Sequence, residues 1–217
     1  MFRRSLAVVG ATVLGAWLAL TIVCVYLVFV KEQSMVYYEN GLLENLQAVL
    51  LVVSCLIFFL TALMNERNDK LILLACALLC YGFFLREVDV ERLDVHAFLV
   101  LIGSGMGRNL ILLLATILIL VVAIRNFAHY WQESMAYLRS PVALLFLLSA
   151  VTLFTGAYFE DANALPHHEF FEEGLELLAY VLILLASLAA RKLVREPAQV
   201  ALQTAEQTDL SQNDGRI

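Results

Sequence analysis

The sequence predicts an all-α membrane protein, a polytopic transmembrane helical bundle of about six spans with both termini in the cytoplasm. Of its 217 residues, 62% are hydrophobic, whereas water-soluble domains are about half apolar. The apolar residues form continuous runs, which favours helices over the alternating strands of a membrane barrel. Basic residues gather in every second polar segment, and such a bias marks the cytoplasmic side of a membrane protein.

Each predicted span is built on one apolar run. A span needs about 20 residues, because the hydrocarbon core is about 30 Å thick and a helix rises about 1.5 Å per residue. Three runs, 71–85, 110–124 and 175–190, are shorter than this, so we expect polar residues at their outer ends to lie below the membrane surface. The predicted spans are near residues 6–30, 41–64, 70–88, 107–125, 141–159 and 171–190.

The spans belong to one predicted transmembrane domain, residues 1–195. Within it, residues 126–139 carry aromatic and apolar side chains at helical spacing, which predicts an amphipathic helix on the cytoplasmic surface. Glycines at 103–107 predict an outer turn after a short helix at 95–102. Residues 196–217 are rich in Gln, Asp and Thr, and this composition predicts a disordered cytoplasmic tail.

Acidic residues lie mainly on the outer side of the predicted bundle. Carboxylates hardly influence topology, so this skew needs another explanation. Polar residues and cysteines recur at helical spacing on one face of each of three predicted spans: Asn40, Glu44, Gln47 and Ser54, then Cys76, Cys80 and Glu87, then Glu169, Glu172, Glu173, Glu176 and Tyr180. Because lipid disfavours such polar faces, we expect them to turn inward and meet.

These residues predict an outward-facing pocket of carboxylates and arginines. Not every carboxylate in such a pocket can stay ionised, and the expected proton holder is Glu173 or Glu176. The predicted proton- or cation-binding residues are Glu44, Glu87, Glu173 and Glu176, with Arg86 and Arg108 setting their charge and Asn40, Gln47, Asn109 and Tyr180 as supporting polar groups.

The leading functional interpretation is a transporter-like or proton- or cation-binding protein. One alternative is a membrane-embedded, metal-dependent hydrolase or transferase acting on a lipid-type substrate, with His167, His168 and Glu169 binding a divalent cation. Another is a non-catalytic assembly or regulatory subunit, and the sequence leaves open whether the protein is an enzyme.

The sequence predicts the lipid bilayer as the main partner, and it leaves a homo- or hetero-oligomer open. It predicts no cofactor other than the divalent cation of the metal-dependent alternative. A basic nucleic-acid patch is missing, and the net charge of −6 argues against nucleic-acid binding.

Three short motifs resemble those of uncharacterised bacterial multi-pass inner-membrane proteins, and the likeness covers most of the membrane region. The motifs are Glu39-Asn40-Gly41-Leu42-Leu43-Glu44-Asn45-Leu46-Gln47-Ala48, Arg86-Glu87-Val88-Asp89 and Glu172-Glu173-Gly174-Leu175-Glu176-Leu177. The resemblance implies a bacterial inner-membrane location and about six spans, and it brings no activity.

Overall fold

The computed structural model describes residues 2–33, 36–37, 41–65, 70–88, 90, 96, 100, 103–160 and 167–214. These residues form seven helices and no strand. In chain order the helices are α1 (Phe2–Phe29), α2 (Leu42–Met64), α3 (Lys70–Glu87), α5 (Gly105–Arg125), α6 (Phe127–Leu138), α7 (Pro141–Glu160) and α8 (His168–Asp214).

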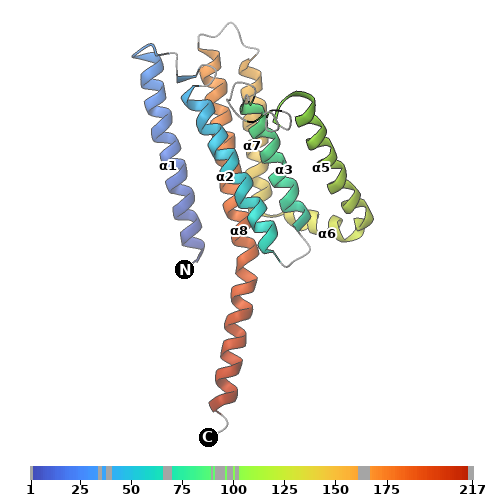
Figure 1. Ribbon diagram of the computed structural model, residues 1–217. Coiled ribbons are helices and arrows are strands. Elements are labelled where there is room, and N and C mark those ends of the chain that lie inside the picture. The colour runs from blue at the N-terminus through green and yellow to red at the C-terminus, as the bar shows by residue number, and fades with distance from the viewer. Residues whose placement is uncertain are drawn as a thin grey trace.

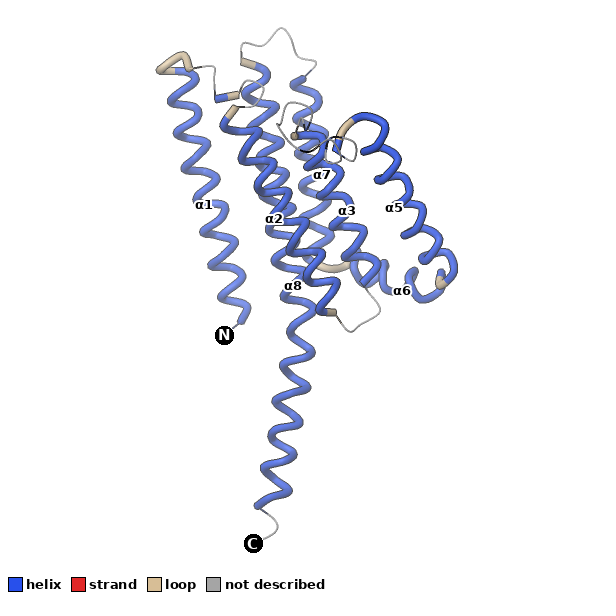
Figure 2. Tube along the Cα trace, viewed as in Figure 1, coloured by secondary structure: helices blue, strands red, loops and turns tan. Residues whose placement is uncertain are grey.

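Successive long helices run in opposite directions. Helices α1, α3 and α7 run toward the upper end of the bundle in Figure 1, whereas α2, α5 and α8 run back from it. Helix α6 lies across the lower end and joins α5 to α7 (Figure 1). The loops gather at the two ends (Figure 2). The N-terminus therefore lies at the lower end, where α8 also leaves the bundle.

Five helices are long and apolar enough to cross a membrane: α1, α2, α5, α7 and the first part of α8, His168–Val194. Large apolar side chains cover the outside, with Leu118 66% and Phe154 81% exposed. Polar Gln47, Ser54 and Ser187 are instead fully buried. A water-soluble protein does not present apolar surface on this scale, so the arrangement is that of a multi-pass membrane protein.

Helix α3 differs from the other long helices in its charged ends. It has 18 residues, with Lys70 at one end and Arg86 and Glu87 at the other, and it is not one of the five apolar candidates. It nevertheless lies antiparallel to α2 along the length of the bundle (Figure 1). Five apolar helices rather than six therefore meet the length and composition of a span, and the predicted span near 70–88 corresponds to the shorter α3.

Helix α8 extends into the C-terminal segment. Helix α8 continues to Asp214, over most of the range 196–217 for which composition predicts a disordered tail. The Gln and Ala residues of this segment are good helix formers, and the segment follows a helix that is already formed. The predicted short helix at 95–102 falls mostly outside the described residues.

Glycine is favoured at positions 103 and 105, where the chain enters α5, for two different physical reasons. A Cβ at Gly103 would lie 2.9 Å from a methyl carbon of Val90, so the close approach of that side chain leaves no room for one. Gly105 has φ of +50°, a backbone conformation that glycine adopts without strain. Together they permit the tight entry into α5 after the bend at Ser104.

The centre of the bundle is formed by α2, α3, α7 and α8. Phe58 of α2 stacks on Phe146 of α7 with ring centroids 5.8 Å apart. Small residues of α8, such as Ala186 and Ala190, are buried, and small residues let membrane helices approach closely. Helix α5 has no buried residue and lies at the periphery.

We expect Phe58→Ala to destabilise the bundle by about 3 kcal/mol, because it leaves a cavity in the core. Its neighbour Phe59 is 44% exposed, so Phe59→Ala is the matched control and should change stability little. Unfolding by SDS in mixed micelles measures both. Equal destabilisation by the two variants would contradict the described packing.

Candidate functional site

Helices α3 and α8 bring charged residues together near the upper end of the bundle. Arg86 Nε donates to Glu87 Oε1 at 3.0 Å, and Arg86 Nη2 donates to Glu176 Oε1. Tyr180 donates its hydroxyl to the same Glu87 Oε1 at 2.7 Å. The side chains of Glu87 and Glu176 are only 7% and 9% exposed. One guanidinium is thus shared by two buried carboxylates.

The local sequence explains why these groups meet. Glu173, Glu176 and Tyr180 follow one another at spacings of three and four, so they share one face of α8. Arg86 occupies the last turn of α3, where a positive charge complements the helix dipole. Glu87 in that same turn is disfavoured by the dipole, and its two hydrogen bonds compensate.

Helix α2 contributes an amide to the same region. Gln47 is fully buried, and its Nε2 donates to Glu173 Oε2 at 2.7 Å and to the Glu173 carbonyl oxygen at 3.0 Å. The carbonyl can only accept, so it fixes which end of the amide faces Glu173. Gln47 Oε1 is buried without a hydrogen-bond partner in the described part of the chain. Glu173 therefore has a neutral partner, in contrast to Glu87 and Glu176.

Helix α7 closes one flank of this cluster with its backbone. Gly156 is buried, and a Cβ there would lie 3.6 Å from the Glu172 carbonyl oxygen and 3.7 Å from Glu176 Cγ. These are ordinary van der Waals distances, so the backbone of α7 packs closely against α8 beside the Glu176 side chain. We call Gln47, Arg86, Glu87, Glu173, Glu176 and Tyr180 the carboxylate cluster.

Other predicted site residues occupy different surroundings. Arg108 Nη1 donates to the Leu85 carbonyl oxygen at 2.8 Å, so it satisfies a free carbonyl at the end of α3 rather than a carboxylate of the cluster. Glu44 is half-buried in the first turn of α2, one turn before Gln47, and Asn109 is exposed on α5. Asn40 lies outside the described residues.

The predicted histidine pair lies beside α1. Tyr37 and His167 are joined by a hydrogen bond of 3.2 Å between the hydroxyl and Nδ1, and the His167 ring contacts Phe29 edge-on at 5.2 Å. Spacing along the chain gave no signal for these aromatic partners. Among the described residues, no three His, Cys, Asp or Glu side chains could hold a metal ion. The metal-dependent alternative with His167, His168 and Glu169 therefore stays a prediction.

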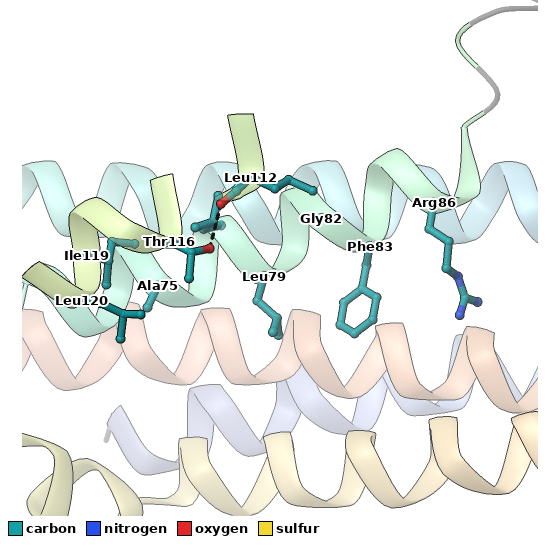
Figure 3. A pocket seen from close by; sticks show the side chains of 10 residues that line it. Ala75, Leu79, Gly82, Phe83, Arg86, Leu112, Thr116, Ile119 and Leu120 are labelled. Carbon is teal, nitrogen blue, oxygen red and sulfur yellow. Dashed lines mark hydrogen bonds between the residues drawn. The ribbon is translucent and has the colours of Figure 1, made fainter. Parts of the chain in front are cut away.

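A cavity of about 590 Å³ lies between α3 and α5. Figure 3 shows Leu79, Phe83 and Arg86 projecting from the same side of α3 along it. The Phe83 ring also lies 5.9 Å from that of Tyr180, so the cavity adjoins the carboxylate cluster. The sequence gives no signal for this cavity, because apolar side chains that line a groove look the same in a sequence as those that face lipid.

Comparisons of the chain with protein families, curated proteins and solved structures find no match. A functional proposal therefore depends on the geometry of the cluster and the cavity.

We expect Tyr180→Phe to lower stability by about 2 kcal/mol, because it removes a donor from a buried carboxylate. Tyr158 is 72% exposed, so Tyr158→Phe should have little effect. The buried thiols of Cys24 and Cys80 allow the measurement, since a thiol-reactive dye reports their exposure during heating. A Tyr180→Phe melting curve that overlays the wild-type curve would show that the hydroxyl contributes nothing.

Proposed function

We propose that this multi-pass membrane protein binds a proton or a small cation in the carboxylate cluster, as a transporter of the bacterial inner membrane would. One observation carries the proposal. Glu87 and Glu176 are buried and paired with the guanidinium of Arg86, and the half-buried Glu173, on the same face of α8 as Glu176, is bound among the described residues only by the neutral Gln47.

The charge balance supports this proposal. If all three carboxylates were ionised, the four groups would carry a net charge of −2. Water screens such an excess at a surface, but a buried site does not. Burying an unpaired charge is costly enough that the group neutralises instead, by taking up a proton or a counter-ion. The cluster is therefore suited to hold one positive charge in addition to Arg86.

Geometry favours Glu173 as the carboxyl that exchanges the proton or cation. Glu87 and Glu176 are both paired with Arg86, whereas Glu173 is held by the neutral amide of Gln47. The unpartnered Gln47 Oε1 is on that same amide, where it supplies a further oxygen acceptor. A carboxylate and an amide oxygen together suit a hard cation as well as a proton.

We place the cluster at the outer face of the membrane because of the basic residues. Arg3, Arg4, Arg125 and Arg139 belong to segments at the lower end of the bundle, and basic residues mark the cytoplasmic side. The upper end, with the carboxylate cluster, would then open toward the periplasm. This placement counts α3 as a span and gives six spans.

Glu173→Gln tests the proton site directly. Wild-type protein should show an infrared carbonyl band of a protonated carboxyl that disappears as the pH is raised, and Glu173→Gln should lack it. Glu169 is exposed on the same helix, so Glu169→Gln is the matched control and should keep the band.

The same spectra distinguish a proton from a cation. If adding sodium or potassium ions at constant pH removes the band in the wild type, the cation displaces the proton at Glu173. If wild type and Glu173→Gln have identical spectra at every pH and ion concentration, neither ligand binds at this residue and the proposal fails.

The topology can be tested with alkaline phosphatase, which is active only outside the cytoplasm. We expect a fusion after Arg139 to be inactive and a fusion after Glu160 to be active, because six spans place them on the inner and outer sides. If α3 did not cross the membrane, the two activities would be exchanged. Immunoblotting of each fusion against alkaline phosphatase serves as the expression control.

A further inference from the structure

The cavity between α3 and α5 is apolar along most of its length. Ala75, Leu79 and Phe83 line one side, and Leu112 and Ile119 line the other. Thr116 also lines it, but its hydroxyl donates to the Leu112 carbonyl oxygen at 2.7 Å, as the dashed line in Figure 3 shows. Its polar group is thereby used within α5, and the wall remains suited to hydrocarbon.

The surroundings of this groove in a bilayer are also hydrocarbon. Helix α5 has no buried residue and contacts the bundle mainly through α3. Its Leu112 approaches Gly82, where a Cβ would lie 3.9 Å from a Leu112 methyl carbon. Apolar cavities exclude water and accept apolar guests, so an acyl chain is the occupant that matches these walls.

The length of the groove matches one leaflet of a bilayer. From Ala75 to Arg86, α3 rises about 16 Å. Half of a hydrocarbon core is about 15 Å thick. An acyl chain lying along α3 would therefore bring its headgroup to the level of Arg86, the charged residue that lines the end of the groove.

Arg86 has hydrogen-bonding capacity left for that headgroup. A guanidinium has five N–H donors, and two of them donate to Glu87 and Glu176. The other three have no partner in the described part of the chain, and the side chain is 54% exposed. Phosphate and ester oxygens are the acceptors that a lipid offers at this depth, and a guanidinium binds phosphate well.

The charge of the site selects among lipids. Arg86 is already paired with two carboxylates, so the three groups together carry a charge of −1 when both are ionised. An anionic headgroup would add to this excess, whereas a zwitterionic headgroup supplies phosphate oxygens together with a compensating ammonium.

We propose that the groove between α3 and α5 binds a zwitterionic phospholipid, with an acyl chain along Leu79 and Phe83 and phosphate oxygens on the remaining N–H donors of Arg86. This site goes beyond the proton or cation site and does not require it. It uses the N–H donors of Arg86 that do not donate to Glu87 or Glu176.

Native mass spectrometry of the full chain in detergent, titrated with phosphatidylethanolamine, tests the proposal. Ala75→Phe fills the groove without altering a member of the carboxylate cluster, and we expect it to weaken lipid binding about tenfold. Ala150 is exposed on α7, so Ala150→Phe adds the same ring to a lipid-facing surface and should bind as the wild type does. Equal affinities of the two variants would overturn the groove as the binding site.

Three further ligands distinguish the contribution of the acyl chains to binding from that of the lipid headgroup. Diacylglycerol with the same chains lacks the phosphate, phosphoethanolamine lacks the chains, and phosphatidylglycerol carries a net negative charge. Each should bind more weakly to the wild type than phosphatidylethanolamine does. Equal binding of diacylglycerol or phosphoethanolamine would overturn the two-part site, and tighter binding of phosphatidylglycerol would overturn its charge preference.

Thermal melting of Ala75→Phe and Ala150→Phe without lipid shows whether each variant is folded. If Ala75→Phe is unfolded, Leu112→Phe replaces it as the groove-filling variant from the α5 side, with the same expected loss. Glu173→Gln should bind phosphatidylethanolamine as the wild type does, so a failure of the proton site and a failure of the lipid site give different results.

Discussion

The ion pairs of Arg86 constrain the rest of this structure. The guanidinium of Arg86 on α3 holds Glu176 of α8 at its own height, because without it the buried carboxylates of Glu87 and Glu176 would be left uncompensated. Tyr180 fixes the same register through its hydroxyl. Such buried pairs add little net stability, and their contribution here is to determine which turn of α3 faces which turn of α8.

The same pattern extends through the bundle: polar side chains face its inside, and apolar side chains face outward. Ser54 and Gln47 of α2 are buried, while Leu56 and Phe59 on the same helix are exposed. In lipid, exposed apolar surface has no cost, so packing and polar contacts rather than hydrophobic burial hold the helices together. The polar contacts are therefore concentrated in the centre, and the outer helices α1 and α5 can be attached more loosely.

The sequence predicted the elements of this site better than its pairings. Apolar runs too short for a bilayer indicated that Glu87 and Glu176 lie below the membrane surface, and both are buried. Helical spacing likewise placed Gln47 and Glu173 on polar faces, and the two are in contact. Spacing cannot tell which partner a long side chain selects, however, so it did not reveal that Arg108 donates to the backbone of α3.

The approach of α7 at Gly156 has a consequence for access to the carboxyl groups. Where side chains separate a buried acid from solvent, a change of rotamer can open a path. On this flank the barrier is main chain, whose peptide planes cannot swing aside without bending the helix. Under the proposed function, a proton or cation reaching Glu176 would therefore pass between side chains on another flank rather than through the backbone of α7.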